Sequence, residues 1–263
     1  MKKQLSYMRV DPAGNITGFV LSPVDPKDRA RIAEAIIKDY DPSVEQVGFI
    51  SENPDGSHRM DMMGGEFCGN ASRSFGLYLA SLHDLKADQS LDLHVSGSQE
   101  PVNVRTNLEN MTAEITLNPA YKVEKLRLAG KTYTTVFLPG IIHVLVDDRE
   151  EDQDFVRDLL EDLKKIQDEE AYGIMFINKD QLSMVPYVYV KETATLIREG
   201  SCGSGTVAAG YFLNENKDPS FKAILKEPGG SLQVSYQEKD GKITYAIGGP
   251  VVFGPKEEIE IDL

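Results

Sequence analysis

The chain has 263 residues, of which 41% are hydrophobic and 27% charged, so it is a globular protein of one large or two ordinary domains and neither disordered nor fibrous. Its formal charge of −14 argues against nucleic acid and anionic membranes as partners, because both require a basic surface. No apolar run approaches the ~20 residues that cross a bilayer, and no apolar segment follows the N-terminal lysines as in a secretory signal. We therefore expect a cytoplasmic protein, in which cysteines stay reduced.

The first half of the chain is predicted to combine strands with two helices. Residues 5–22 contain two strand-like runs around a Pro-Ala-Gly-Asn turn. A helix is predicted over 25–40, where isoleucines recur at helical spacing, and a second helix begins within 64–83. The other predicted strands of this half cover 45–51, 59–63, 91–97, 102–106 and 113–118.

The second half repeats this order. A hairpin and a following strand are predicted over 125–146, and an amphipathic helix over 152–169. Two strand segments, a small-residue helix and a hairpin with an Asp-Gly turn are predicted in 172–178, 186–197, 204–215 and 231–247. The acidic runs are predicted to be solvated faces and cover 147–154 and 255–263.

Two residue pairs indicate an internal duplication. Phe176 follows Phe49 by 127 residues, and Cys202 follows Cys68 by 134, within segments of the same order. The two cysteines, which are the only ones in the sequence, would then occupy equivalent positions. A cleft between the halves could bring them face to face.

Each cysteine stands directly before a glycine at the predicted start of a helix, in "EFCGNAS" (66–72) and "EGSCGSGT" (199–206). The first turn of a helix leaves N–H groups unpaired and carries partial positive charge. It can therefore bind a carboxylate and lower the pKa of a nearby thiol toward neutral pH. Gly69 and Gly203 would let the backbone approach a ligand closely.

Asn70 and Ser204 add short polar groups beside the two thiols. Two such helix starts facing each other would hold one carboxylate and flank the adjacent carbon with two sulfurs. This arrangement suits inversion at a carbon that carries a proton, because one thiolate can remove the proton while the opposite thiol delivers another. The helix N–H groups would stabilise the charge that develops on the carboxylate.

The sequence supports other roles for the cysteines less well. An isolated buried cysteine is most often a small hydrophobic residue, and a structural disulfide is uncommon in the cytoplasm. The two cysteines and four scattered histidines do not form a zinc pattern, so no metal site is predicted. The 199–206 segment lacks the Gly-Lys-Ser/Thr ending of a phosphate-binding loop.

The paired motifs resemble those of the cofactor-independent, two-cysteine racemases and epimerases of the diaminopimelate epimerase superfamily. The resemblance covers nearly the whole chain. It implies an α/β (α+β) fold of two pseudo-symmetric halves, each a curled, mostly antiparallel sheet around a central helix. It also implies that the C-terminal strand returns to the first half, so the expected domains are 1–118 plus 252–263 and 119–251. No cofactor is expected, and a homodimer is compatible with the resemblance.

The finer similarity is to the histidine racemases of that superfamily, including those serving opine metallophore synthesis. The similar stretches are 11–15, 45–50, 64–72, 199–206 and 227–231. By this resemblance Cys68 and Cys202 are the acid/base pair that interconverts L- and D-histidine, a small-molecule amino-acid substrate. The implied substrate contacts are the side chains of Asn15 and Asn70, the amides of Gly203 and Ser204, the neighbouring Gly69, and the candidate carboxylates Glu45, Glu66 and Glu199.

Departures from diaminopimelate epimerase argue against diaminopimelate as the substrate. The family's Gly-Asn-Pro-His stretch appears as residues 140–143, with Ile141 in place of a polar contact, and Met184 replaces an expected Asn. Of the usual Glu-Arg-Gly run, only Arg198 and Glu199 remain. An apolar distal pocket could not solvate a second amino-carboxylate group, so histidine fits better.

Four alternatives stay open. A mutase-like isomerase of the same superfold fits less well than the others, because such enzymes usually lack the second cysteine. Diaminopimelate epimerase itself, or a broad-specificity amino-acid racemase, would use the same two cysteines. A non-catalytic amino-acid-binding protein would bind its ligand without proton exchange at Cα. A redox sensor would close a disulfide between Cys68 and Cys202.

Overall fold

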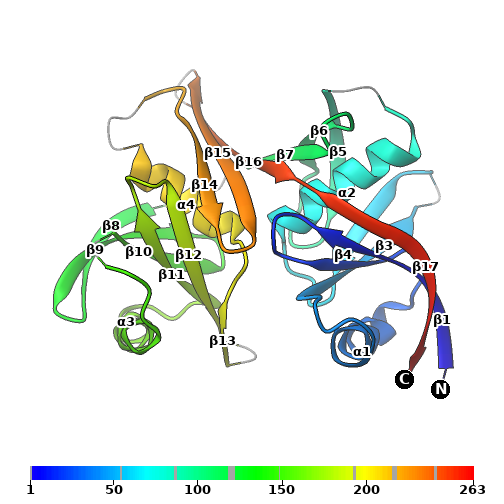
Figure 1. The fold of residues 1–263 in the computed structure, drawn as a ribbon, viewed down its shortest axis with the longest axis horizontal. Coiled ribbons are helices and arrows are strands. Elements are labelled where there is room, and N and C mark those ends of the chain that lie inside the picture. Colours follow the sequence, from blue (N-terminus) through cyan, green and yellow to red (C-terminus); the bar gives the residue numbers. More distant parts are fainter. Residues whose placement is uncertain are drawn as a thin grey trace. The chain divides into compact units, whose positions relative to one another are not determined.

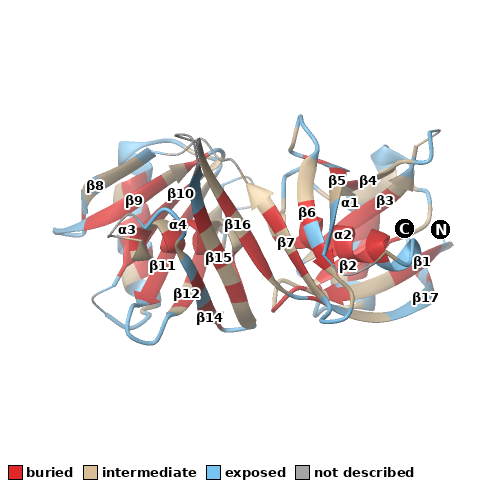
Figure 2. Ribbon diagram, turned by 90° about the horizontal axis from the view of Figure 1, so that it is seen from above, coloured by how far each residue is buried: buried red, intermediate tan, exposed pale blue. Residues whose placement is uncertain are grey.

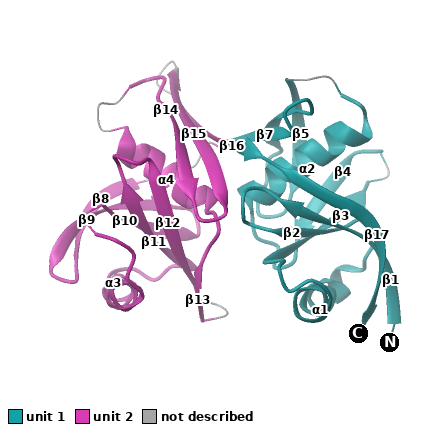
Figure 3. Ribbon diagram, in the orientation of Figure 1, with its two compact units in different colours: residues 1–116, 248–263 teal, residues 117–247 magenta. Residues whose placement is uncertain are grey.

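The structure is a computed structural model, which describes residues 2–53, 55–85, 88–117, 122–147, 149–191, 194–214, 218–239 and 242–263. It divides into two compact units of mixed α/β structure, mostly strands with few helices, as expected for the α/β (α+β) class (Figures 1 and 3). The first unit is Met1–Thr116 with Gly248–Leu263, and the second is Leu117–Ile247. The sequence interpretation had placed these boundaries after residues 118 and 251.

In its described residues, the first unit contains one long helix and three short helical segments that follow one another. The helical segments are η1 (Pro26–Asp28), α1 (Arg29–Ala35), η2 (Ile36–Tyr40) and α2 (Gly69–Leu82). Its strands are β1 (Lys2–Asp11), β2 (Thr17–Val20), β3 (Gln46–Glu52), β4 (His58–Met62), β5 (Gln89–Val95), β6 (Val102–Asn107), β7 (Thr112–Leu117) and β17 (Val252–Asp262).

The strands of the first unit form a mixed sheet that curls around α2. Strand β1 pairs antiparallel with both β17 and β2, so the C-terminal strand returns to the first unit as the resemblance implied. The β2–β3 and β4–β5 pairs are parallel, whereas β3–β4, β5–β6 and β6–β7 are antiparallel. Helix α2 packs on β5 and β6, while α1 packs on β3 and β17.

The part of the second unit that the structure describes has two helices and the larger share of the strands. The helices are α3 (Gln153–Ile166) and α4 (Gly203–Leu213). The strands are β8 (Lys122–Leu128), β9 (Lys131–Leu138), β10 (Ile141–Val146), β11 (Ala171–Asn178), β12 (Ser183–Val190), β13 (Thr195–Arg198), β14 (Lys222–Glu227), β15 (Gly230–Lys239) and β16 (Lys242–Pro250).

The second unit repeats the strand pairing of the first. Here β10–β11 and β12–β14 are the parallel pairs, and β8–β9, β9–β10, β11–β12, β12–β13 and β14–β15 are antiparallel. Helix α4 packs against β9, β10, β11, β12, β14 and β15, and α3 packs on β8 and β11. A sheet around a central helix, with a second helix on its other face, therefore occurs twice.

The strand register confirms the internal duplication. Val20 of β2 is paired with Phe49 of β3, and Val146 of β10 is paired with Phe176 of β11, in parallel ladders of the same kind. The phenylalanines that suggested the repeat are therefore equivalent in structure. The cysteines are equivalent too, because each is the N-cap residue of its unit's central helix.

The central helices are buried on nearly all sides, unlike the outer helices, which are amphipathic. In α2 every residue from Asn70 to Ala80 is buried, and Figure 2 shows this helix in red. Such burial requires small residues where strands approach closely. A Cβ at Gly76 would lie 2.6 Å from a methyl group of Val104, and a Cβ at Gly210 of α4 would lie 2.6 Å from one of Val234.

Several predicted elements differ from those observed. The helix predicted over 25–40 is broken into 3-10, α and π segments. Strand β14 was not predicted. Its exposed positions carry an isoleucine as well as lysines, so the sequence does not alternate clearly between apolar and polar residues. The predicted Asp-Gly turn at 240–241 lies outside the described residues. No helix of the described chain is long and apolar enough to cross a membrane.

Candidate active site

Cys68 stands at the N-terminus of α2 in extended backbone geometry, with φ −126° and ψ 113°. Its sulfur accepts a hydrogen bond from the Ala71 N–H at 3.4 Å, and its carbonyl accepts one from the Ser72 hydroxyl at 2.7 Å. A cysteine thus fills the N-cap position that serine, threonine or aspartate usually takes. The first turn of α2 therefore directs a backbone N–H, that of Ala71, at the sulfur.

Side chains from the β2 edge and from β3 reach the same sulfur. The Gln46 amide donates to Cys68 Sγ at 3.2 Å and also lies 2.7 Å from Asn15 Oδ1 and 2.9 Å from Thr17 Oγ1. The thiol lies 3.7 Å from the same Asn15 oxygen, and Asn15 donates to Glu45 at 3.3 Å. Of the residues proposed from sequence, Asn15 and Glu45 are therefore joined to Cys68 in one hydrogen-bond network.

From the sequence, Asn70 was expected to place a polar side chain beside the thiol, but this side chain is engaged elsewhere. It is only 2% exposed, and its Oδ1 accepts from Nε of Arg73 at 3.1 Å. The fully buried Arg73 also donates to the carbonyls of Pro12 at 2.7 Å, Gly249 at 2.9 Å and Pro250 at 3.1 Å. Arg73 was not identified from the sequence, although it holds the loop before Asn15, α2 and the end of β16 together.

Glu66 is exposed just before Cys68, and its backbone carbonyl accepts from the Ser96 hydroxyl at 2.7 Å. Its negative charge raises the pKa of the thiol, in addition to the larger effect of burial. Hydrogen bonds from Ala71, Gln46 and Asn70 lower that pKa but do not outweigh burial. The pKa of Glu45 is also raised, because its carboxylate is partly shielded from water.

Cys202 occupies the equivalent position at the start of α4, with φ −130° and ψ 107°. Its backbone N–H donates to the Glu227 carboxylate at 2.8 Å, and the same carboxylate accepts from the Thr206 hydroxyl at 2.6 Å. Thr206 also lies 2.7 Å from the Cys202 carbonyl, as Ser72 does in the first unit. Glu227 is buried and comes from β14, so the start of α4 is anchored by a strand that the sequence did not predict.

Ser204 links Cys202 to a buried histidine. Its hydroxyl lies 3.6 Å from Cys202 Sγ and 2.9 Å from Nε2 of His143 on β10. Burial lowers the pKa of His143 to about 3, so its imidazole is neutral at physiological pH. His143 was noted in the sequence only as the last residue of 140–143, without a role.

Glu199 is half-buried ahead of Cys202, and its N–H donates to the Pro186 carbonyl at 3.0 Å. Its neighbour Arg198 forms a two-point ion pair with Glu151, at 2.6 and 2.7 Å, so its guanidinium is engaged within the second unit. Met184, noted as a departure from diaminopimelate epimerase, is 1% exposed on β12.

The expected lowering of the cysteine pKa values is wrong for this structure. Burial raises the pKa of Cys202 well above its ordinary value, and the negative charges of Glu199 and Glu227 raise it further. The Ser204 hydroxyl and the Gly205 N–H lower it only in part. The helix start does act in the predicted direction at both cysteines, but loss of hydration is the larger effect. Both thiols are therefore protonated at neutral pH.

Gly69 and Gly203 are the first residues of their helices. At Gly203 a Cβ would lie 2.8 Å from Cδ1 of Ile247, so packing within the unit accounts for this glycine as well as any approach of a ligand. Among the described residues, no group of three or more His, Cys, Asp or Glu side chains could hold a metal ion.

The comparison with known protein families decides which family these two cysteine environments belong to. The family model described as histidine racemase CntK N-terminal domain matches residues 4–252, nearly the whole chain. The chain belongs to the histidine racemase family. It is therefore an isomerase of the racemase type, as the cysteine motifs predicted.

Named histidine racemases are similar over most of their length. The one from Fusobacterium nucleatum subsp. nucleatum is 35% identical over 256 residues, covering 94% of each chain. The one from Staphylococcus aureus (strain Mu50) is 29% identical over 250 residues, covering 89% of each chain. The crystal structure of a hydroxyproline epimerase from Agrobacterium vitis has the same fold, with a TM-score of 0.69 over 98% of this chain and 92% of that chain at 11% identity.

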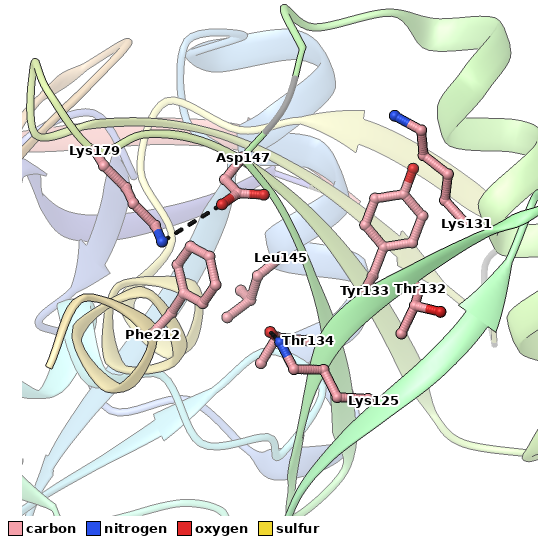
Figure 4. A pocket seen from close by; sticks show the side chains of 9 residues that line it. All are labelled: Lys125, Lys131, Thr132, Tyr133, Thr134, Leu145, Asp147, Lys179 and Phe212. Atoms are coloured by element: carbon pink, nitrogen blue, oxygen red, sulfur yellow. Dashed lines mark hydrogen bonds and ion pairs between the residues drawn. The ribbon is translucent and has the colours of Figure 1, made fainter. Parts of the chain in front are cut away.

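A separate cavity of the second unit contains none of the residues proposed for racemase chemistry. It has a volume of about 200 Å³ and lies between β8, β9 and the end of α4 (Figure 4). Lysines line it, but Lys179 is paired with Asp147 at 3.5 Å and lies over the ring of Phe212. Lys125 donates to Thr134. Lys179 and Lys125 are thus engaged by neighbouring side chains of the protein, and the cavity is not a candidate for the active site.

Proposed function

We propose that the protein interconverts L- and D-histidine at Cα, without a cofactor, and that Cys68 and Cys202 are the two acid/base groups. The observation that carries this proposal is that each cysteine is the N-cap residue of the central helix in one of two repeated units. Membership of the histidine racemase family supports histidine as the substrate.

In the proposed reaction, one cysteine thiolate takes the α-proton from one face of histidine. The electrons of the broken Cα–H bond remain on the substrate as a carbanion adjacent to the carboxylate. The other cysteine then donates its S–H proton to Cα from the opposite face, which inverts the stereocentre and leaves the second sulfur as the thiolate. No atoms are gained or lost, and the reverse reaction uses the same two groups in exchanged roles.

The raised pKa values place one requirement on this mechanism. Since both thiols are protonated in the free protein, one of them must lose a proton when substrate binds. The ammonium group of the amino acid would favour the thiolate, because an opposite charge a few ångströms away stabilises the ionised form. The displaced proton leaves to solvent. Asn15, Glu45, Glu66 and Glu199 are the proposed polar contacts for the ammonium and the imidazole.

The substrate carboxylate would be held by the N–H groups at the two helix starts. Gly69, Gly203 and Ser204 supply these groups, because N–H groups of a first helical turn have no partner within the helix. They would also stabilise the negative charge that reaches the carboxylate as the proton leaves. Asn70 has no part in holding the carboxylate, since its backbone is hydrogen-bonded to Cys68 and its side chain to Arg73.

Proton exchange provides the test. L-histidine is incubated with the protein in D₂O without pyridoxal phosphate, and loss of the Cα–H signal is followed by NMR together with optical rotation. We expect both signals to decay, and expect Cys68→Ser and Cys202→Ser each to abolish the decay of optical rotation. Full racemisation by either variant would exclude the two-base mechanism.

The same assay separates the alternatives. Diaminopimelate and the common L-amino acids are tested under identical conditions, and faster exchange with one of them than with histidine would replace histidine as the substrate. Binding of histidine without any exchange would indicate an amino-acid-binding protein. We further infer that the protein is cytoplasmic and acts without nucleic-acid or membrane partners, since both cysteines are free thiols and the chain is strongly acidic.

A further inference from the structure

One loop differs in length between the two repeated units. In the first unit it joins β1 to β2 and consists of residues 12–16. In the second unit it joins β9 to β10 and consists of Pro139 and Gly140. The two strands that it joins are antiparallel neighbours in both units. The additional length is therefore a feature of the first unit alone.

The longer loop carries Asn15, whose side chain reaches the Cys68 sulfur. Its Oδ1 accepts from the Gln46 amide at 2.7 Å and lies 3.7 Å from the sulfur. Its amide group donates to the Glu45 carboxylate at 3.3 Å. The two-residue turn of the second unit has no corresponding position. The place of this asparagine in the proposed active site therefore depends on how the loop is held.

The loop has an unfavourable backbone conformation. Two successive residues, Ala13 and Gly14, have positive φ values of 66° and 95°. Glycine adopts such a conformation readily, whereas alanine is strained in it because its Cβ crowds the backbone. The Asp11 carboxylate accepts from the Gly14 N–H at 2.7 Å and supports the turn from within. Strain of this kind persists only where neighbouring groups fix the conformation.

Arg73 of α2 fixes the loop from outside. Its completely buried guanidinium donates to the Pro12 carbonyl at 2.7 Å, three residues before the asparagine. It also donates to the carbonyls of Gly249 and Pro250, at 2.9 and 3.1 Å. The planar guanidinium presents its N–H groups in fixed directions, so it can hold several carbonyls at once. The loop is thereby tied to the end of β16.

The second unit has an apolar residue at the equivalent position of its central helix. Arg73 is five residues after Cys68, and the residue five positions after Cys202 is the buried Val207. These positions correspond, because both cysteines are the N-cap residues of their helices. The arginine thus occurs in the unit with the longer loop, and the valine in the unit with the two-residue turn.

We propose that Arg73 is a positioning residue for the racemase reaction, because its hold on the Pro12 carbonyl places Asn15 beside the Cys68 sulfur and the substrate. The proposal deepens the two-base function and rests on it for its catalytic meaning. Arg73 exchanges no proton and acts through the loop. The carbonyls at the end of β16 provide the second anchor, so the C-terminal part of the chain contributes to the position of the asparagine.

Racemisation kinetics provide the first test. Arg73→Lys keeps the charge but replaces the planar group by a single ammonium, which cannot hold all of these oxygens. We expect kcat/KM for L-histidine to fall about tenfold, because small displacements of a group at the reacting atoms cost this much or more. Arg105→Lys, the same substitution at an exposed ion pair with Glu114, is the matched control and should keep wild-type kinetics. Wild-type kinetics in Arg73→Lys would overturn the proposal.

A double-mutant cycle separates positioning from general support of the fold. Asn15→Ala alone should lower kcat/KM, and the addition of Arg73→Lys should lower it by less than about twofold more, because the group that the arginine positions is already absent. A further loss as large as in the wild-type background would mean that the arginine acts independently of the asparagine. That result, or full activity of Asn15→Ala, would overturn the proposal.

Hydrogen exchange tests the same link without substrate. In Arg73→Lys we expect peptides that cover residues 12–16 to exchange faster, while β5 and β6, which pack on α2, keep their wild-type rates. Asn70→Ala removes only the acceptor of the arginine Nε–H and should produce a smaller effect in the same loop, including where Arg73→Lys does not fold. Equal acceleration throughout the first unit, or an unchanged loop in both variants, would overturn the proposal.

These measurements distinguish a failure of this proposal from a failure of the proposed function. A protein that racemises histidine but shows no change in the loop of Arg73→Lys would overturn the positioning role alone. A protein that does not exchange the α-proton of histidine, yet shows acceleration confined to residues 12–16, would overturn the proposed function and support Arg73 as the residue that holds the loop.

Discussion

Because His143 is buried, this single residue contributes to the pH dependence of the free energy of unfolding. Its pKa is lowered to about 3 by burial, whereas a histidine in the unfolded chain titrates near its ordinary value of 6.5. Between these values the unfolded chain binds a proton that the folded chain does not. The stability that this residue contributes is therefore complete above pH 6.5 and is lost as the pH falls toward 3.

We predict that His143→Gln flattens this dependence. Between pH 6.5 and 4.5 the free energy of unfolding of the wild-type protein should fall by about 2–3 kcal/mol more than that of the variant, at about 1.4 kcal/mol per pH unit. Urea unfolding at both pH values measures the difference. His94→Gln, at an exposed position, serves as the matched control and should behave as the wild type does. Equal pH slopes for all three proteins would mean that His143 is protonated in the fold.

Single residues were predictable from sequence where the signal is local. The cysteines, the glycines after them and the polar residues that follow lie within a few positions of one another, and a helix start defines their chemistry. Contacts from distant segments gave no such signal. His143 reaches Ser204 across 61 residues, and Arg73 gathers carbonyls from both ends of the chain. The sign of the cysteine pKa shifts was missed for the same reason, since burial depends on the whole unit.

At the scale of elements, the strands that pack on the central helices limit the size of the side chains that these helices can carry. Gly76 and Gly210 stand eight residues after Cys68 and Cys202, and each meets a valine of the neighbouring antiparallel pair. Alanine is favoured over glycine within a helix by up to ~1 kcal/mol. The close contact with a β-branched side chain should outweigh this gain, because overpacking costs about 1–3 kcal/mol.

We predict that Gly76→Ala destabilises the protein even though it improves helix propensity. The double variant Gly76→Ala/Val104→Ala should recover part of this loss, so a double-mutant cycle should give a favourable coupling of about 1 kcal/mol or more. Gly210→Ala with Val234→Ala is the same experiment in the second unit and should give the same sign. Additive effects at either pair would show that the helix shifts to accept the methyl group.

Strands and helices were predicted well where one face is buried and the other exposed. The amphipathic α3 follows its predicted range closely, and Leu159, Leu160 and Leu163 are buried on its inner face. Strand β14 was missed because its outward positions include the exposed Ile224 between lysines, which weakens the alternation of polar and apolar residues. The segmented helix at 26–40 could not be foreseen, since its changes in pitch depend on tertiary packing.

At the scale of the whole molecule, the chain closes its first unit with its last strand. Ile259 of β17 is paired with Leu5 of β1, and both belong to a buried cluster with α1 and β3. The second unit has its own cluster, in which Leu159 of α3 packs against β10 and β11. The sequence indicated this division through the repeat and through the family resemblance, because a strand that crosses back to an earlier unit leaves no local pattern.

Hydrogen exchange can show whether these two clusters support the units separately. Ile259→Ala removes buried methyl groups from the first cluster and should cost about 2–5 kcal/mol. We expect it to accelerate exchange in β1, β3 and β17, while Leu159→Ala, the matched truncation in the second cluster, should accelerate exchange in α3, β10 and β11. Mass spectrometry of peptides from both units measures this directly. If each variant instead accelerates exchange equally throughout the chain, the repeated units do not open independently, and the return of β17 stabilises both of them as one cooperative structure.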